Sequence, residues 1–103
     1  MANPLQPKCI KVLEQDYNAY VIKITSASKA GHMDIIACIK GLFYGFEIKW
    51  KSDVPSELQK DKINKVIDAG GKAYFIHSVK QLKDIMDNDI APFKYELSNR
   101  FII

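Results

Sequence analysis

The chain has 103 residues with a formal net charge of +3, and 48% of its residues are hydrophobic and 26% charged. This length predicts one domain with a real core, and the composition excludes a disordered chain. The longest apolar runs span only a few residues, against the roughly 20 that a membrane-spanning helix needs, so we expect no membrane segment. The first residues show neither a basic nor an apolar leader region, which predicts a cytoplasmic protein. The lysine-heavy composition and small size suggest a bacterium or a phage-infected cell as its source.

The first quarter of the chain predicts a helix and then a strand. Apolar residues recur at helical spacing over residues 4–16. Residues 20–24 are β-branched and aromatic, which is typical of a strand. Small and polar residues then fill 25–31 and predict a loop.

The stretch 34–50 predicts an antiparallel hairpin. A short apolar run from Asp34 precedes Lys40-Gly41, which we expect to form the turn, and a second apolar strand follows. Gly45 inside that second strand indicates a bulge or a close approach of the backbone.

The second half predicts a helix over 55–70, a strand over 73–76 and a helix to about Met86 that a capping box of Ser78 and Gln81 opens. The order helix-strand-strand-strand-helix-strand-helix predicts an α/β fold, with a mixed four-stranded sheet flanked by helices. Its crossover connection is expected to be right-handed.

The two cysteines predict no disulfide and no zinc site. Cys9 and Cys38 sit in apolar patterns and lack the Cys and His spacing of a metal centre. We expect two buried, reduced thiols.

Three charged residues of the predicted hairpin suggest chemistry. Glu47 and Lys49 are two apart on one strand and project from the same face, and Asp34 opens the other arm, across from Glu47. Two carboxylates that converge repel each other unless a cation lies between them, and such oxygen ligands suit Mg²⁺. A solvated strand face with one ion pair, and an aspartate that ends a loop, would explain the same residues without a metal.

The chain also resembles a known family in a series of residues in a set order: Gly31-x-x-Asp34, Glu47-x-Lys49, Gln59 early in a helix, and Gly70 before a strand. This order resembles the PD-(D/E)XK nuclease superfamily, and most closely its small VRR-NUC members, which are similar to Holliday-junction resolvases. The resemblance covers about residues 4–86. It implies a restriction-endonuclease-like core in a single domain over 1–103, with a C-terminal tail at 87–103.

The resemblance implies a DNA endonuclease that depends on Mg²⁺ or Mn²⁺. The metal would be bound by Asp34, Glu47 and the backbone carbonyl of Ile48, while Lys49 would help to activate water. Gln59 would lie beside the active site, in agreement with its place on the apolar stripe of its helix. We expect DNA contacts from lysine and hydroxyl residues of the neighbouring loops, which a solvated surface would also explain: Lys23, Ser26, Ser28, Lys29 and Lys51.

Two departures from the family pattern matter. Met33 stands where the motif usually has Pro, which mainly affects the turn. Family members often carry a metal-supporting Glu near the start of the first helix, where this chain has Ala2 and Asn3 and no acid before Glu14. A chain of 103 residues has little surface for reading a base sequence, so we expect a structure-selective nuclease acting on branched DNA, such as a flap or four-way junction. The resemblance implies a homodimer. The missing Glu leaves open a DNA-binding module on the same fold that has lost catalysis.

Overall fold

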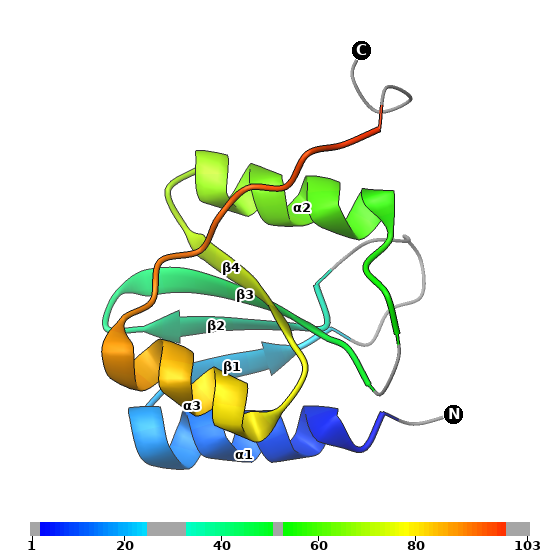
Figure 1. The fold of residues 1–103 in the computed structure, drawn as a ribbon. Coiled ribbons are helices and arrows are strands. Elements are labelled where there is room, and N and C mark those ends of the chain that lie inside the picture. Colours follow the sequence, from blue (N-terminus) through cyan, green and yellow to red (C-terminus); the bar gives the residue numbers. More distant parts are fainter. Residues whose placement is uncertain (1–2, 25–32, 51–52, 99–103) are drawn as a thin grey trace.

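The computed structural model describes residues 3–24, 33–50 and 53–98. Its elements run in the predicted order (Figure 1): α1 (Leu5–Tyr17), β1 (Tyr20–Lys23), β2 (Ile35–Ile39), β3 (Leu42–Ile48), α2 (Glu57–Asp68), β4 (Lys72–Ile76) and α3 (Val79–Asn88). No helix within these ranges is long and apolar enough to cross a membrane.

The four strands form one mixed sheet in the order β1-β2-β3-β4. The pairs β1/β2 and β2/β3 are antiparallel, whereas β4 runs parallel to β3 and is reached through α2. The hairpin turns at Lys40-Gly41 as predicted, and both residues have positive φ values, 52° and 79°. A two-residue turn of this kind matches the twist of the flanking strands and sets their register.

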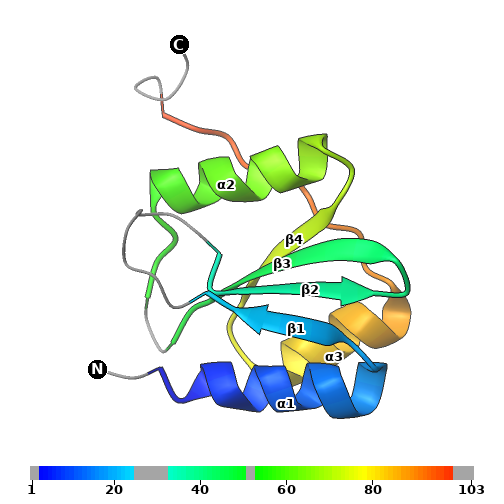
Figure 2. The same cartoon turned by 180° about the vertical axis from the view of Figure 1, so that it is seen from behind.

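The sheet lies between two layers of helices, with α1 and α3 on one face and α2 on the other (Figures 1 and 2). The larger core, under α1 and α3, contains Leu13, Phe46 and Leu82. The smaller core, under α2, contains Ile63 and Phe75. Because successive strand residues point to opposite faces, β3 buries Phe46 in the larger core and directs its neighbours toward α2.

The start of α2 differs from the prediction by two residues. Pro55, expected in the first turn, lies before the helix; Ser56 is the N-cap, and its Oγ accepts a hydrogen bond from the backbone of Gln59 at 3.1 Å. The Gln59 side chain accepts in return from the backbone of Ser56 at 3.0 Å, which completes a capping box that the sequence analysis missed. At α3 the predicted box is only half formed, because the Gln81 side chain accepts from His77 rather than from Ser78.

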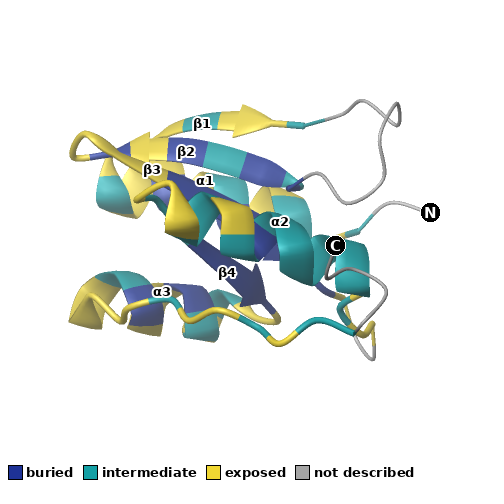
Figure 3. Cartoon of the chain, turned by 90° about the horizontal axis from the view of Figure 1, so that it is seen from above, coloured by how far each residue is buried: buried dark blue, intermediate teal, exposed yellow. Residues whose placement is uncertain are grey.

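Gly45 and Cys38 correct two other predictions. The β2/β3 register runs without interruption through Gly45, so there is no bulge. The close approach at this glycine comes from the Met33 side chain, whose Cγ would lie 3.1 Å from an added Cβ. Cys9 is buried as predicted, but Cys38 is exposed. On its face of the sheet, α2 lies mainly over β3 and β4, and β1 and much of β2 extend beyond the helix, as the view onto α2 in Figure 3 shows.

The segment after α3 returns across the molecule to α2 (Figure 1). Asn64 of α2 exchanges two hydrogen bonds of 2.8 Å with the backbone of Tyr95, and the Tyr95 ring packs edge-on against Phe75. The part of the tail before residue 99 therefore contacts α2 and β4 through Tyr95. Residues 99–103, with the apolar end of the tail, lie outside the described part of the chain.

Candidate active site

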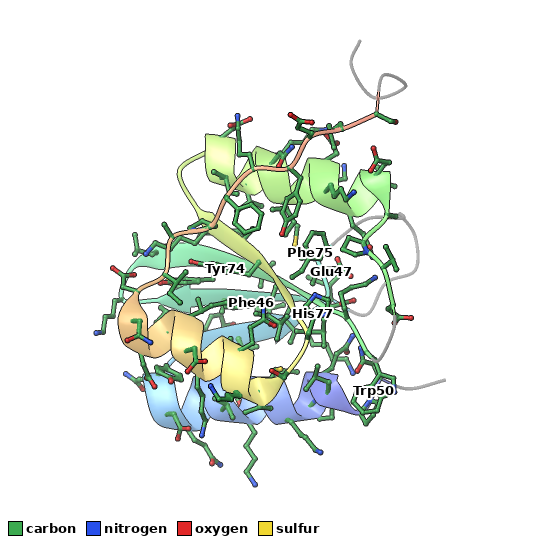
Figure 4. All side chains as sticks on the ribbon, in the orientation of Figure 1. Phe46, Glu47, Trp50, Tyr74, Phe75 and His77 are labelled. Carbon is green, nitrogen blue, oxygen red and sulfur yellow. The ribbon has the colours of Figure 1, made fainter. Side chains whose placement is uncertain are left out.

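The carboxyl groups of Asp34 and Glu47 lie close together at one end of the sheet. The backbone N–H of Asp34 donates to the carbonyl of Phe46 at 3.1 Å, and Phe46 is the residue that pairs with Ile35, so Asp34 leaves the regular β2/β3 register just before β2 begins. Its carboxyl group is near enough to raise the pKa of Glu47, as expected of two carboxyl groups that the hairpin brings together. Figure 4 places Glu47 at the end of the sheet toward Trp50 and His77.

Backbone contacts hold the Asp34 side chain against the end of β3. The N–H of Ile48 donates to Asp34 Oδ2 at 2.7 Å. Since the N–H and C=O of one strand residue point to the same side, the Ile48 carbonyl also faces the side of Asp34. The three oxygen donors predicted for a metal, those of Asp34, Glu47 and Ile48, therefore come together.

Glu47 is a buried carboxyl with incomplete pairing. The residue is 4% exposed; its Oε1 accepts from Gln59 Nε2 at 3.1 Å, and its Oε2 has no hydrogen-bond partner among the described residues. The pKa of Glu47 is raised from 4.5 to about 9, first by burial and then by the neighbouring Asp34 carboxyl group, while the charge of Lys49 acts in the opposite direction. The positive charge of Lys49 therefore does not offset the cost of an ionised, buried Glu47.

Gln59 connects Lys49 to Glu47. Lys49 is 8% exposed and lies on the same face of β3 as Glu47; its Nζ donates to Gln59 Oε1 at 3.1 Å. The same oxygen accepts from the backbone of Ser56, while the Gln59 amide nitrogen donates to Glu47. One side chain therefore caps α2, holds the ammonium group of Lys49 and donates to the carboxyl group of Glu47. The prediction that Gln59 points inward is confirmed by these contacts.

Asn3 is a site residue that the sequence analysis did not identify. Its Oδ1 accepts from the backbone of Leu5 at 2.9 Å, which caps the start of α1, and its Nδ2 donates to the carbonyl oxygen of Ile48 at 3.2 Å. An amide thus stands at the place where the family pattern has an acid. Glu14 is exposed about three turns further along the chain, on α1, and does not replace it. An Asn directly before Pro4 at a helix start was the available signal.

The predicted DNA contacts are only partly open to description. Lys23 is exposed at the end of β1. Ser26, Ser28, Lys29 and Lys51 lie outside the described residues, so their role stays a prediction.

The donor set fits a hard divalent cation. The described ranges contain no group of three or more His, Cys, Asp and Glu side chains that could hold a metal. Two carboxylates and a backbone carbonyl form a small set of oxygen ligands, which suits Mg²⁺, because this ion keeps several waters and takes further oxygens from a substrate phosphate. The unpaired Glu47 Oε2 is the atom that most requires such a partner.

No protein-family model matches the sequence, and no curated protein matches it either. The fold does match solved structures. A solved VRR_NUC domain aligns with a TM-score of 0.70 at 17% identity, over 84% of this chain and 94% of that chain. The chain has the VRR-NUC fold. A Holliday junction resolvase, Hjc of Archaeoglobus fulgidus, aligns with a TM-score of 0.57 at 14% identity, over 75% of this chain and 68% of that one.

These alignments confirm the predicted nuclease fold, with its αβββαβα order and mixed four-stranded sheet. In this chain the site lies where one end of the sheet meets the residue before α1 and the N-terminal part of α2. At identities of 17% and 14% the likeness concerns the fold.

Proposed function

We propose that this chain is a Mg²⁺- or Mn²⁺-dependent endonuclease that hydrolyses DNA phosphodiester bonds in an active site formed by Asp34 and Glu47. The observation that carries the proposal is the buried Glu47 carboxyl, whose Oε2 is unpaired and which faces a second carboxyl group. A buried carboxyl group beside a second, half-buried one is unfavourable for a scaffold unless the two bind a cation.

In this reaction Asp34, Glu47 and the Ile48 carbonyl would hold the metal. The bound ion supplies Lewis acidity for the phosphate and lowers the pKa of water. The hydrogen bond from Ile48 N–H fixes the orientation of the Asp34 carboxyl group, and the bond from Gln59 does the same for Glu47. The protein thereby keeps both ligands in place before substrate binds.

Lys49 would act on the attacking water and on the phosphate. Its ammonium group donates one hydrogen bond to Gln59, which leaves two N–H donors for the reacting groups. A buried cation at this position stabilises the negative charge that develops on the phosphate oxygens.

The substrate we propose is branched DNA, bound by a homodimer. A fold of 103 residues with a net charge of +3 favours contacts to the phosphate backbone and to DNA shape over readout of bases. The Holliday junction resolvase that shares the fold supports a branched substrate. A two-fold dimer would present two active sites to two strands of such a junction.

A second function has its own observation. Asn3 contributes a neutral amide at the edge of the site, and with fewer acids the metal would be held more weakly. The alternative function is therefore a DNA-binding module on the same fold. Such a module would hold the metal too weakly for catalysis, so it would bind DNA without cleaving it.

The test is a cleavage assay on labelled linear duplex, single strand, flap and four-way junction, each with Mg²⁺, with Mn²⁺ and with EDTA. The variants are Glu47→Gln, which is isosteric, and the matched control Glu14→Gln, on an exposed site of α1. Metal-dependent cleavage that is lost in Glu47→Gln and kept in Glu14→Gln supports the nuclease. Binding without cleavage under every metal contradicts it and favours the binding module.

A further inference from the structure

The sheet face that carries the active site is only half covered. The helix α2 packs against β3 and β4, and Figure 3, which looks down on α2, shows β1 and much of β2 beyond the helix. Four exposed side chains from three adjacent strands share this open half and form what we call the platform: Tyr20, Ile22, Cys38 and Phe43.

The platform presents two aromatic rings in one row. Tyr20 pairs with Cys38 across β1 and β2, and Cys38 pairs with Phe43 across β2 and β3. The small Cys38 therefore lies between two rings that are 70% and 49% exposed. An apolar surface of this kind needs a partner that supplies flat, apolar faces.

A groove with a cationic wall separates the platform from α2. It has a volume of about 280 Å³, an apolar floor that includes Ile36 and Phe43, and a wall on α2 that includes Lys62 and Lys65. The two lysines lie three positions apart and so share one side of the helix. Lys65 also pairs with Asp61 but its side chain stays 65% exposed. No ion pair of the described residues involves Lys62.

The groove leads to the active site. The groove is lined in part by Met33, which directly precedes Asp34. The Met33 side chain lies over Gly45. Phe43 and Glu47 point to the same face of β3 and are four residues apart, or about 13 Å along the strand. A polymer that lies on the platform is thus only a few nucleotides from the carboxylates.

We propose that an unpaired, single-stranded segment of the DNA substrate binds this platform, with bases stacked on Tyr20 and Phe43 and the phosphate backbone along Lys62 and Lys65. This inference rests on the proposed nuclease function and adds to it the part of a branched substrate that the protein recognises. Stacking on aromatic side chains needs exposed base faces, which a duplex hides in its own stack. A flap or an open branch point provides them.

The observations favour DNA over a second copy of the chain as the occupant. Tyr20 and Ile22 lie on the edge strand β1, which ends in the exposed Lys23, and a lysine on an edge strand opposes pairing with another strand. The lysines of the groove wall would repel the same lysines of a copy, but they complement phosphate.

The first experiment measures binding in EDTA, where no cleavage occurs, by fluorescence anisotropy of labelled oligothymidylate and of a blunt duplex of equal length. The double variant Tyr20→Ala/Phe43→Ala is compared with Phe93→Ala, which removes a 65% exposed ring on the segment after α3. We expect single-strand affinity to fall by about tenfold or more in the double variant. Duplex affinity and the control variant should hardly change.

A second measurement needs no substitution and therefore no assumption about folding. Alkylation of Cys38 by iodoacetamide, followed by mass spectrometry, reports on access to the platform, because the only other cysteine, Cys9, is buried and burial raises the pKa of its thiol to about 11. Oligothymidylate should slow the reaction of Cys38, and the duplex should not.

Three outcomes would overturn the inference. Unchanged single-strand binding in the double variant, with Cys38 equally reactive with and without oligothymidylate, contradicts it while leaving cleavage at Glu47 intact. Protection of Cys38 that rises with protein concentration alone, and a dimer that the double variant dissociates, would assign the platform to a second copy. A wild-type protein that binds no DNA of any form would contradict the proposed function itself.

Discussion

Asn3 donates a hydrogen bond from Nδ2 to the carbonyl oxygen of Ile48 at 3.2 Å, across 45 positions of the sequence. The contact joins the start of α1 to the end of β3, at a carbonyl that we propose as a metal ligand. The same side chain caps α1 through Leu5. Asn and Asp are equally good at such helix starts, so the position accepts a carboxylate without a cost to the helix.

The first prediction concerns Asn3→Asp. A carboxylate in place of the amide adds a negative oxygen beside the proposed ligands, and we expect the affinity for Mn²⁺ to rise by about tenfold, since affinity in such sites follows the number of charged ligands. Isothermal titration calorimetry measures this without any DNA. Gln15→Glu, which adds the same charge at an exposed site of α1, is the control. Equal Mn²⁺ affinity in both variants would contradict a metal beside Ile48.

Local geometry explains why the carboxylate pair could be predicted from sequence. The two-residue turn at Lys40-Gly41 pairs Ile39 with Leu42, and counting outward along both strands pairs Ile35 with Phe46, which brings the next residues, Asp34 and Glu47, to the same end of the hairpin. The alternation of strand side chains then places Lys49 beside Glu47. These relationships depend only on a turn type and a period of two.

The relationships that could not be predicted depend on packing between distant segments. Which polar atom α1 presents to Ile48 follows from where that helix lies under the sheet, and no spacing rule gives this. The exposure of Cys38 likewise depends on how far α2 extends across the sheet. The apolar sequence of β2 is compatible with a helix over both faces of the strand or over one face only, so it does not predict whether Cys38 is exposed.

The second prediction is a pH dependence of stability in the metal-free protein. The pKa of Glu47 is raised from 4.5 to about 9, first by burial. The unfolded chain releases this proton above about pH 4.5 and the native state keeps it up to about pH 9, so stability falls as the pH rises through this window. Glu47→Gln removes the titration and should raise Tm at the alkaline end by about 5 °C, or about 1 kcal/mol for a domain of this size.

Thermal unfolding in EDTA across the pH range, followed by circular dichroism, tests this. Mn²⁺ should raise the Tm of the wild type at alkaline pH and leave Glu47→Gln unchanged, because the metal binds the ionised carboxylate of the native state only. Parallel pH profiles of the two proteins in EDTA would contradict a protonated Glu47.

The third prediction separates Lys49 from the metal ligands. Lys49→Met keeps an unbranched side chain but removes the charge beside the phosphate, and we expect cleavage to fall by about a hundredfold or more. The affinity for Mn²⁺ should not fall, because the variant retains Asp34 and Glu47. The matched control is Lys80→Met, whose side chain is 85% exposed on α3. A joint loss of Mn²⁺ binding and cleavage would mean that Lys49 supports the ligands instead of the reaction.

The last prediction concerns Gln59 and uses its helix cap as an internal control. Gln59→Ala removes the acceptor of the Lys49 ammonium group, the donor to Glu47 and one half of the capping box. Ser56→Ala removes only the other half of the box, because the Gln59 side chain still accepts from the backbone of residue 56. Loss of a cap costs about 1 kcal/mol of stability in either variant.

If Gln59 positions Lys49 and Glu47, Gln59→Ala should lower kcat by at least about tenfold with little change in KM, while Ser56→Ala keeps kcat near the wild type. The pH profile gives an independent readout: without the donor from Gln59 the ionised form of Glu47 loses a stabilising hydrogen bond, so the pH at which Mn²⁺ binds should shift upward. Equal kcat values in the two variants, with equal losses of Tm, would reduce Gln59 to a cap of α2. The hydrogen bonds of Gln59 with Lys49 and Glu47 would then stabilise the fold without a role in the reaction.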